Sequence, residues 1–133
     1  MSSKPVTYLD SSAIVKLVID EPESAALQQF LHQQKPLVSS ALARAEVSRA
    51  VLAFGPAALA AAQEVLGRID LLRVNNRILE MASTLKPNSL RTLDAIHLAS
   101  ALSLEDSLAD FVCYDRRLSQ AAAHQGWAIQ NPT

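Results

Sequence analysis

The sequence of 133 residues contains one cysteine, three glycines and no surplus of basic residues. Because Cys113 has no second cysteine to pair with, an internal disulfide is excluded, which fits a reducing cytoplasm. With so few glycines the chain is not rich in loops, and a hydrophobic content of 50% is enough for the core of one domain. The formal net charge of -1 means that any contact with nucleic acid must depend on a local basic patch.

Long hydrophobic runs are also missing. The longest stretch without a charged residue, 50–63, is too short to span a membrane and contains Gly55 and Pro56. Residues 1–5 lack the apolar region of a signal peptide. We therefore expect a cytoplasmic protein without membrane contact, folded as one domain over residues 1–133.

Short apolar runs alternate with helical segments along the chain. Strands are predicted at 6–9, 37–38, 71–74, 111–114 and 127–130. Helices are predicted at 13–19, 23–34, 41–54, 56–69, 75–85, 93–103 and 117–124, with Ser39 and Ser40 capping the third of them. This alternation predicts an α/β fold with a central, mostly parallel five-stranded sheet and helices on both faces.

Four carboxylates occupy distinctive places in this pattern. Asp10 directly follows the first predicted strand and Asp115 the fourth, so both are expected at the carboxyl edge of a parallel sheet. Asp94 lies in the first turn of a helix, and Glu46 lies inside a helix among small apolar residues. Taken singly, each has an ordinary explanation as a helix cap or an ion-pair partner.

Taken together, the four acids favour a metal site. Carboxylates crowded into one crevice repel each other unless they take up protons or share a cation. Oxygen ligands suit Mg²⁺ or Mn²⁺, and a metal with open coordination positions can activate water and clamp a phosphate. No cysteine and histidine residues are spaced for zinc.

The surroundings of these acids resemble the motifs of the PIN-domain family. YLDSSA at 8–13 is similar to its first motif, AEV at 45–47 to its second and YDRRL at 114–118 to its fourth. LDAIHLA at 93–99 resembles the third motif and is the most specific of the set. The motifs occur in the family's order and the resemblance covers essentially the whole chain. The small size resembles the VapC branch of ribonuclease toxins.

The resemblance implies a single PIN-like nuclease domain that hydrolyses RNA phosphodiesters with Mg²⁺ or Mn²⁺. It implies that Asp10, Glu46, Asp94 and Asp115 are the catalytic metal ligands, supported by Ser12. It further implies a homodimer and a cognate VapB-like antitoxin. Cys113 departs from the family, which often carries threonine or serine two residues before the fourth aspartate.

The side chains near these acids, His97, Arg91, Arg116 and Ser11, can each be explained by a functional or by a purely structural role. His97 is interpreted as a partner that orients Asp94 rather than as a general base. Arg91 and Arg116 are candidates for RNA phosphate contact, with ordinary ion pairing as the alternative. Ser11 is read as a capping residue, because the sequence places no base to activate it as a nucleophile.

Three other functions remain as rivals. A receiver-like phosphoacceptor needs adjacent acids after the first strand, but Asp10 is followed by Ser11. A haloacid-dehalogenase-type phosphatase needs an acid at position 12, which is serine. The remaining alternative is a catalytically silent PIN-like module that only binds RNA or protein.

Overall fold

A computed structural model describes residues 4–32 and 36–133 of the chain. Its five strands are β1 (Val6–Leu9), β2 (Leu37–Ser40), β3 (Asp70–Leu72), β4 (Leu108–Val112) and β5 (Ile129–Gln130). They form one sheet in the order β3-β2-β1-β4-β5, and every pairing is parallel. The predicted five-stranded parallel sheet is therefore confirmed.

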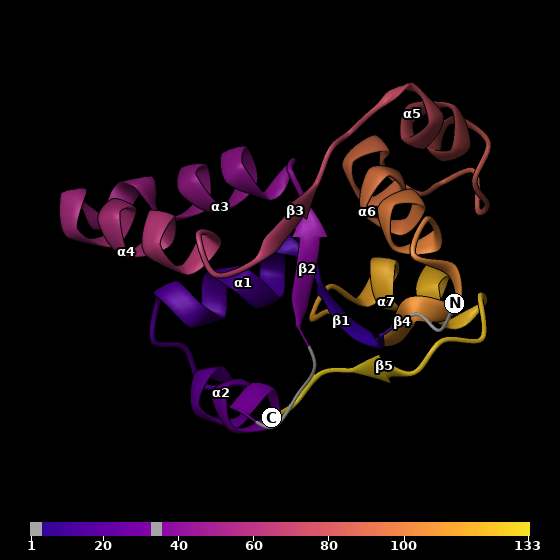
Figure 1. The fold of residues 1–133 in the computed structure, drawn as a ribbon. Coiled ribbons are helices and arrows are strands. Elements are labelled where there is room, and N and C mark those ends of the chain that lie inside the picture. The colour runs from indigo at the N-terminus through magenta and orange to yellow at the C-terminus, as the bar shows by residue number, and fades with distance from the viewer. Residues whose placement is uncertain (1–3, 33–35) are drawn as a thin grey trace.

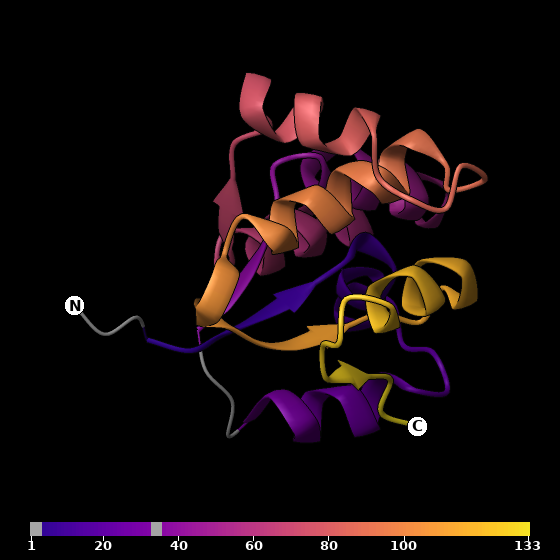
Figure 2. The same cartoon turned by 90° about the vertical axis from the view of Figure 1, so that its right-hand side faces the viewer.

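Helices cover both faces of this sheet, as predicted. One face carries α1 (Ser11–Val18), α2 (Ser24–His32), α3 (Ala43–Val51) with the short η1 (Leu52–Phe54), and α4 (Pro56–Leu66). The other carries α6 (Thr92–Leu102) and α7 (Arg116–Ala123), and α5 (Asn76–Ser83) packs against α6. Figure 1 shows this division, and Figure 2 shows α6 crossing the sheet between α5 and α7. Among the described residues, no helix is long and apolar enough to cross a membrane.

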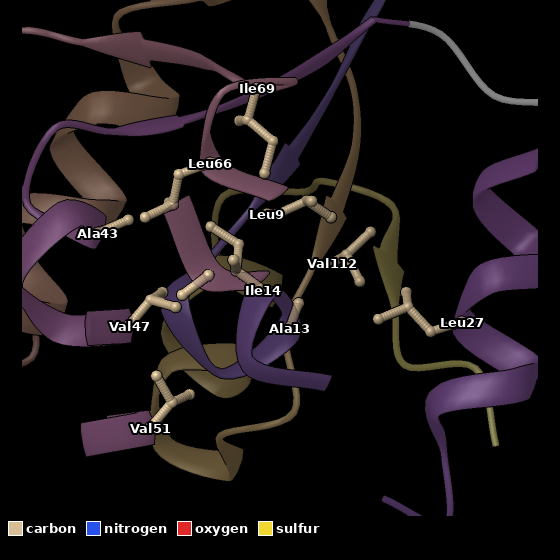
Figure 3. Packing of buried hydrophobic residues seen from close by; sticks show 11 residues of the cluster. Leu9, Ala13, Ile14, Leu27, Ala43, Val47, Val51, Leu66, Ile69 and Val112 are labelled. Carbon is tan, nitrogen blue, oxygen red and sulfur yellow. The ribbon is translucent and has the colours of Figure 1, made fainter. Parts of the chain in front are cut away.

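Two hydrophobic clusters fill the space between sheet and helices. Successive side chains of a strand point to opposite faces, so Leu9 and Val112 enter one cluster while Tyr8 and Phe111 enter the other. Figure 3 shows the first cluster, in which Leu9 and Val112 meet side chains such as Ile14 from the covering helices. Burial on both faces fixes the central strands β1 and β4, which carry the acidic residues at their carboxyl ends.

The fourth strand begins and ends earlier than the predicted 111–114. Pairing with β1 draws Leu108–Val112 into the sheet, although Asp110 interrupts its apolar pattern. A short 3₁₀ turn, η2 (Glu105–Ser107), leads into it. Asp115 therefore does not directly follow the strand, because Cys113 and Tyr114 lie between.

The second strand is longer than the predicted 37–38. Ser39 and Ser40 belong to β2, and pairing with β3 keeps them in the sheet instead of at the start of a helix. The Ser39 hydroxyl donates a hydrogen bond to the Leu9 carbonyl oxygen at 2.6 Å, which satisfies a polar side chain inside the core. The predicted capping by these serines is wrong, because the N-cap of α3 is Leu42 and has no side-chain capping hydrogen bond. Ser40 instead accepts from the Leu42 N–H at 3.1 Å in the turn before the helix.

The other element boundaries shift by a few residues. The third strand lies at Asp70–Leu72 instead of 71–74, and the fifth is shorter than the predicted 127–130, because Trp127 and Ala128 lie outside it. The helix predicted at 56–69 ends at Leu66, which leaves room for the turn into β3. The helix predicted at 23–34 is seen to His32, and its last two predicted residues lie outside the described residues.

Candidate active site

The site lies at the carboxyl ends of the two central strands. From β1 the chain passes to β2 and β3 on one side of the sheet, and it then returns to β4 on the other side of β1. This is a topological switch point, where open parallel sheets leave a crevice for ligands. Asp10 follows β1 at once, and Asp115 follows the neighbouring β4 after two residues.

Asp10 is held by several donors although it is almost fully buried, with 3% exposure. It caps helix α1 by accepting from the Ala13 N–H at 3.0 Å, and the Ser12 hydroxyl donates to both of its oxygens at 2.7 and 2.9 Å. Ser12 in turn accepts from the Tyr114 N–H at 3.1 Å, which joins the ends of β1 and β4. Burial nevertheless raises the pKa of the Asp10 carboxyl above its ordinary value.

Cys113 provides a further donor to Asp10. Its thiol lies 3.2 Å from Asp10 Oδ2 and is completely buried. Burial, followed by the nearby Asp10 charge, raises the pKa of this thiol far above its ordinary value, so it stays protonated and can donate. A thiol is a weaker donor than the hydroxyl of threonine or serine, but Cys113 makes the contact to Asp10 that such a hydroxyl could make from the same position.

Glu46 is anchored from the opposite side by a chain of hydrogen bonds. Its Oε1 atom accepts from the Ser11 hydroxyl at 2.6 Å and lies 2.7 Å from His97 Nε2. The other ring nitrogen of His97 lies 2.8 Å from the hydroxyl of Tyr8, which is fully buried and stacked on Phe111. Burial acts to raise the pKa of Glu46, but the hydrogen bonds from His97 and Ser11 outweigh it and lower that pKa.

His97 therefore contacts Glu46, whereas the sequence suggested that it would orient Asp94. It is only 2% exposed. The positions of the two residues on α6 explain why they do not meet. His97 faces the sheet, where its side chain contacts Tyr8 and Glu46, whereas Asp94 lies in the more exposed first turn. The sequence did not single out Tyr8, and only its place before Leu9 in an alternating strand could have indicated it.

Asp94 and Asp115 are held much more loosely. Asp94 Oδ2 is buried and has no hydrogen-bond partner, and its nearest cation, Arg91 Nε, is 3.6 Å away. Asp115 caps α7 by accepting from the Leu118 N–H at 2.9 Å, and Arg91 Nη2 lies 3.8 Å from its other oxygen. Burial raises the pKa of Asp94, and the negative charges of Asp115 and Asp10 add to this effect.

These residues fit a divalent cation on two observations. The first is the buried, unpartnered oxygen of Asp94, because such an atom is costly to bury without a partner. The second is the donor chemistry: the described hydrogen bonds to Glu46 all use Oε1, which leaves Oε2 for another ligand. Within the described ranges, however, no three acidic, histidine or cysteine side chains converge closely enough to form a ready metal site. A cation would have to draw the carboxylates together.

The two arginines named from the sequence lie in different surroundings. Arg91 reaches both Asp94 and Asp115, as its two ion pairs show. Arg116 lines a separate hollow with Tyr114 and Asn131. Arg117, which is not one of these two, lines the hollow that contains Asp94.

Comparison with known proteins identifies clear relatives. The model of the family described as "PIN domain" matches residues 7–123. The chain is 52% identical over 126 residues to a Mycobacterium tuberculosis protein named Ribonuclease VapC46, covering 95% of this chain and 97% of that one.

Solved structures share the fold at low sequence identity. M. tuberculosis VapC20, titled a sarcin-ricin loop cleaving toxin, superposes with a TM-score of 0.73 at 16% identity, covering 95% of this chain and 99% of that chain. VapBC2 from Rickettsia felis, titled as bound to a DNA fragment from their promoter, gives a TM-score of 0.67 at 13% identity, covering 96% and 99%.

Proposed function

The chain belongs to the PIN-domain family, and from that premise we propose that it is a metal-dependent endoribonuclease, the toxin of a VapBC-type toxin–antitoxin pair. Residues 1–133 form one nuclease domain that acts on RNA in the cytoplasm. The observation that carries this proposal is the buried Asp94 oxygen that lacks a partner, close to the negative charges of Asp115 and Asp10 at the ends of β4 and β1.

The four acids are proposed to hold Mg²⁺, with Mn²⁺ as a substitute. Both cations prefer oxygen ligands, and the relatives at the sequence level are named ribonucleases. When bound, the cation would polarise the phosphodiester and make water more acidic. Glu46, Asp94 and Asp115 each keep one oxygen that takes no described hydrogen bond and could serve as a ligand. Both oxygens of Asp10 accept hydrogen bonds, so Asp10 would share its oxygens between the cation and these donors.

The remaining side chains orient the acids and the RNA. Ser12 and Cys113 hold Asp10 in place, and His97 with Ser11 holds Glu46. Arg91, exposed over 67% of its side chain, is placed to contact a phosphate that enters above Asp94 and Asp115. Hydrolysis adds water to the phosphorus atom and breaks one P–O bond, while these groups keep substrate and carboxylates aligned.

The decisive experiment is cleavage of a mixed cellular RNA pool by the purified protein. The assay compares Mg²⁺, Mn²⁺ and chelator, and it includes Asp10→Asn and Asp94→Asn. Discrete cleavage that needs the metal and both aspartates would support the proposal. A folded wild-type protein that binds RNA but cleaves none of it with either metal would favour the silent RNA-binding module instead.

The proposed partners follow from the same premise. A structural neighbour is titled as a VapBC pair, so we infer a cognate VapB-like antitoxin for this chain. We also infer a homodimer, as the family resemblance implies. Co-expression of a small DNA-binding protein encoded beside this chain should relieve the growth arrest caused by the toxin alone, and light scattering should give twice the mass of one chain.

A further inference from the structure

A hollow of about 370 Å³ opens beside Asp94, between the loop that precedes α6 and one flank of α7. Figure 2 shows this loop and α7 on the same side of the molecule. Polar side chains line the hollow from both walls: Arg91, Asp94, Arg117, Gln120 and His124. It therefore adjoins the acidic site but brings hydrogen-bond donors and positive charge to it.

Helix α7 supplies most of these donors from one flank. Arg117, Gln120 and His124 are separated by three and four residues, so they share a side of the helix, and all three are exposed. The opposite side packs into the core through Leu118 and Ala122. The flank is thus fixed in position by the core, while its polar side chains face the hollow.

Arg117 is a free cation within the described part of the chain, where no carboxylate pairs with it. Its neighbour Arg116 carries the same charge but lines another hollow, with Ser119 and Asn131. One helix therefore presents two adjacent arginines to two different surfaces. Of these two arginines, Arg117 is the one that shares a hollow with Asp94.

We propose that the α7 flank formed by Arg117, Gln120 and His124, together with Arg91, binds the phosphate backbone of single-stranded RNA next to the bond that is cleaved. This inference rests on the proposed nuclease function and adds a substrate-binding surface to it. An anionic strand is repelled by an acidic site, so cations beside that site are needed to hold it. Arginine suits this role because its planar donors match phosphate oxygens.

The dimensions agree with a short stretch of RNA. Arg117 and His124, the C-cap residue of α7, are seven positions apart, which at a rise of about 1.5 Å per residue is roughly 10 Å. A stacked strand advances about 3.4 Å per nucleotide, so the flank covers about three nucleotides. Gln120 stands between the two basic residues and can donate to a phosphate or a ribose hydroxyl.

The test measures RNA binding and needs no cleavage. A random pool of short, fluorescein-labelled single-stranded oligoribonucleotides is titrated with Mg²⁺ present, in an Asp10→Asn background that preserves the helix cap. Arg117→Gln is compared with Arg116→Gln on the same helix. Arg68→Gln serves as a control for net charge, since Arg68 is exposed, pairs with Glu64 and precedes β3 at the other end of the sheet.

We expect Arg117→Gln to weaken binding roughly three- to tenfold at low salt. The slope of log K against log salt should fall by about 0.7, the value for one phosphate contact on a single strand. Arg116→Gln should lower log K by less than half as much as Arg117→Gln does. Arg68→Gln should change neither log K nor the salt slope. Equal losses for Arg116→Gln and Arg117→Gln, or no loss for Arg117→Gln, would overturn the inference.

Wild-type cleavage of the cellular RNA pool is measured in parallel, so that the two proposals can fail separately. If the wild type cleaves RNA but Arg117→Gln has unchanged RNA affinity, the proposed α7 surface is overturned and the proposed nuclease function is not. If the folded wild type neither binds nor cleaves RNA, both proposals are overturned.

Discussion

The two ends of the acidic cluster differ in how their carboxylates are held. At one end, which we term the ordered half, Glu46 is fixed by Ser11 and His97, and Tyr8 fixes His97 in turn. At the other end, the open half, Asp94 and Asp115 share one loosely placed cation, Arg91, at 3.6 and 3.8 Å, and Asp115 also caps α7. The difference also appears in the pKa values, which are lowered for Glu46 and raised for Asp94.

This contrast separates two tasks of an active site. The ordered half is prearranged by the fold, because its partners are buried in the sheet and in α6. The open half retains repulsion and an unpartnered oxygen, which a cation could relieve. Removing groups from each half should therefore have different consequences for stability and for activity.

The largest effect is expected for Asp94→Asn in the open half. The variant should lose about 100-fold or more of RNA cleavage, because a ligand of the proposed metal is neutralised. Without metal it should be more stable than the wild type by about 1 kcal/mol, since a destabilising buried charge disappears. Cleavage rates and urea unfolding measure the two quantities, with Asp106→Asn on an exposed turn as the matched control.

The stability that Asp94→Asn gains over the wild type should depend on pH. The folded pKa of Asp94 is raised above its unfolded value, so ionisation of Asp94 destabilises the native state. The destabilisation is absent below the unfolded pKa of about 3.9, grows as pH rises toward the folded pKa and is complete above it. The stability difference between Asp94→Asn and wild type should therefore widen from acidic to neutral pH. A constant difference would contradict this account.

Metal addition should produce the next largest effect. A cation at 100 times its dissociation constant stabilises the native state by about 2.7 kcal/mol, if the unfolded chain does not bind it. Thermal unfolding with and without Mg²⁺ measures the shift, and Asp94→Asn should remove most of it. The same shift in both proteins would place the cation away from the open half.

A smaller loss is expected for Tyr8→Phe in the ordered half. The ring can still stack on Phe111, but the partner of His97 Nδ1 is lost. Cleavage should fall about tenfold and the free energy of unfolding by about 1 kcal/mol, because Glu46 is positioned less firmly. Tyr114→Phe removes a hydroxyl bonded to the Pro132 carbonyl and is the matched control. It should lower stability similarly and leave cleavage intact.

The smallest effects concern Cys113, which lies beside Asp10 between the two halves. Cys113→Ser keeps a donor toward Asp10 Oδ2 and should change cleavage by less than about threefold. Cys113→Ala removes the donor and should destabilise the fold by about 1 kcal/mol. If alanine is tolerated as well as serine, the thiol has no part in holding Asp10.

The fold was predictable because its signals are local or periodic. Alternating short apolar runs and helices indicate a parallel sheet covered on both faces, and the structure has that arrangement. Boundaries were less predictable where pairing overrode composition. Asp110 concealed the start of β4, and Ser39 and Ser40 resembled caps although they pair with β3.

The sequence by itself determined the four acids and their attachment to strand ends and helices, since each stands in a recognisable local motif. Contacts across the sheet were decided only by the tertiary structure. The packing of α6 over the sheet places His97 in contact with Tyr8 and Glu46 rather than with Asp94. The orientation of α7 sends Arg117, and not Arg116, into the hollow beside Asp94. These contacts depend on which face of each helix packs against the core. Spacing along the chain does not reveal which distant residues lie next to that helix.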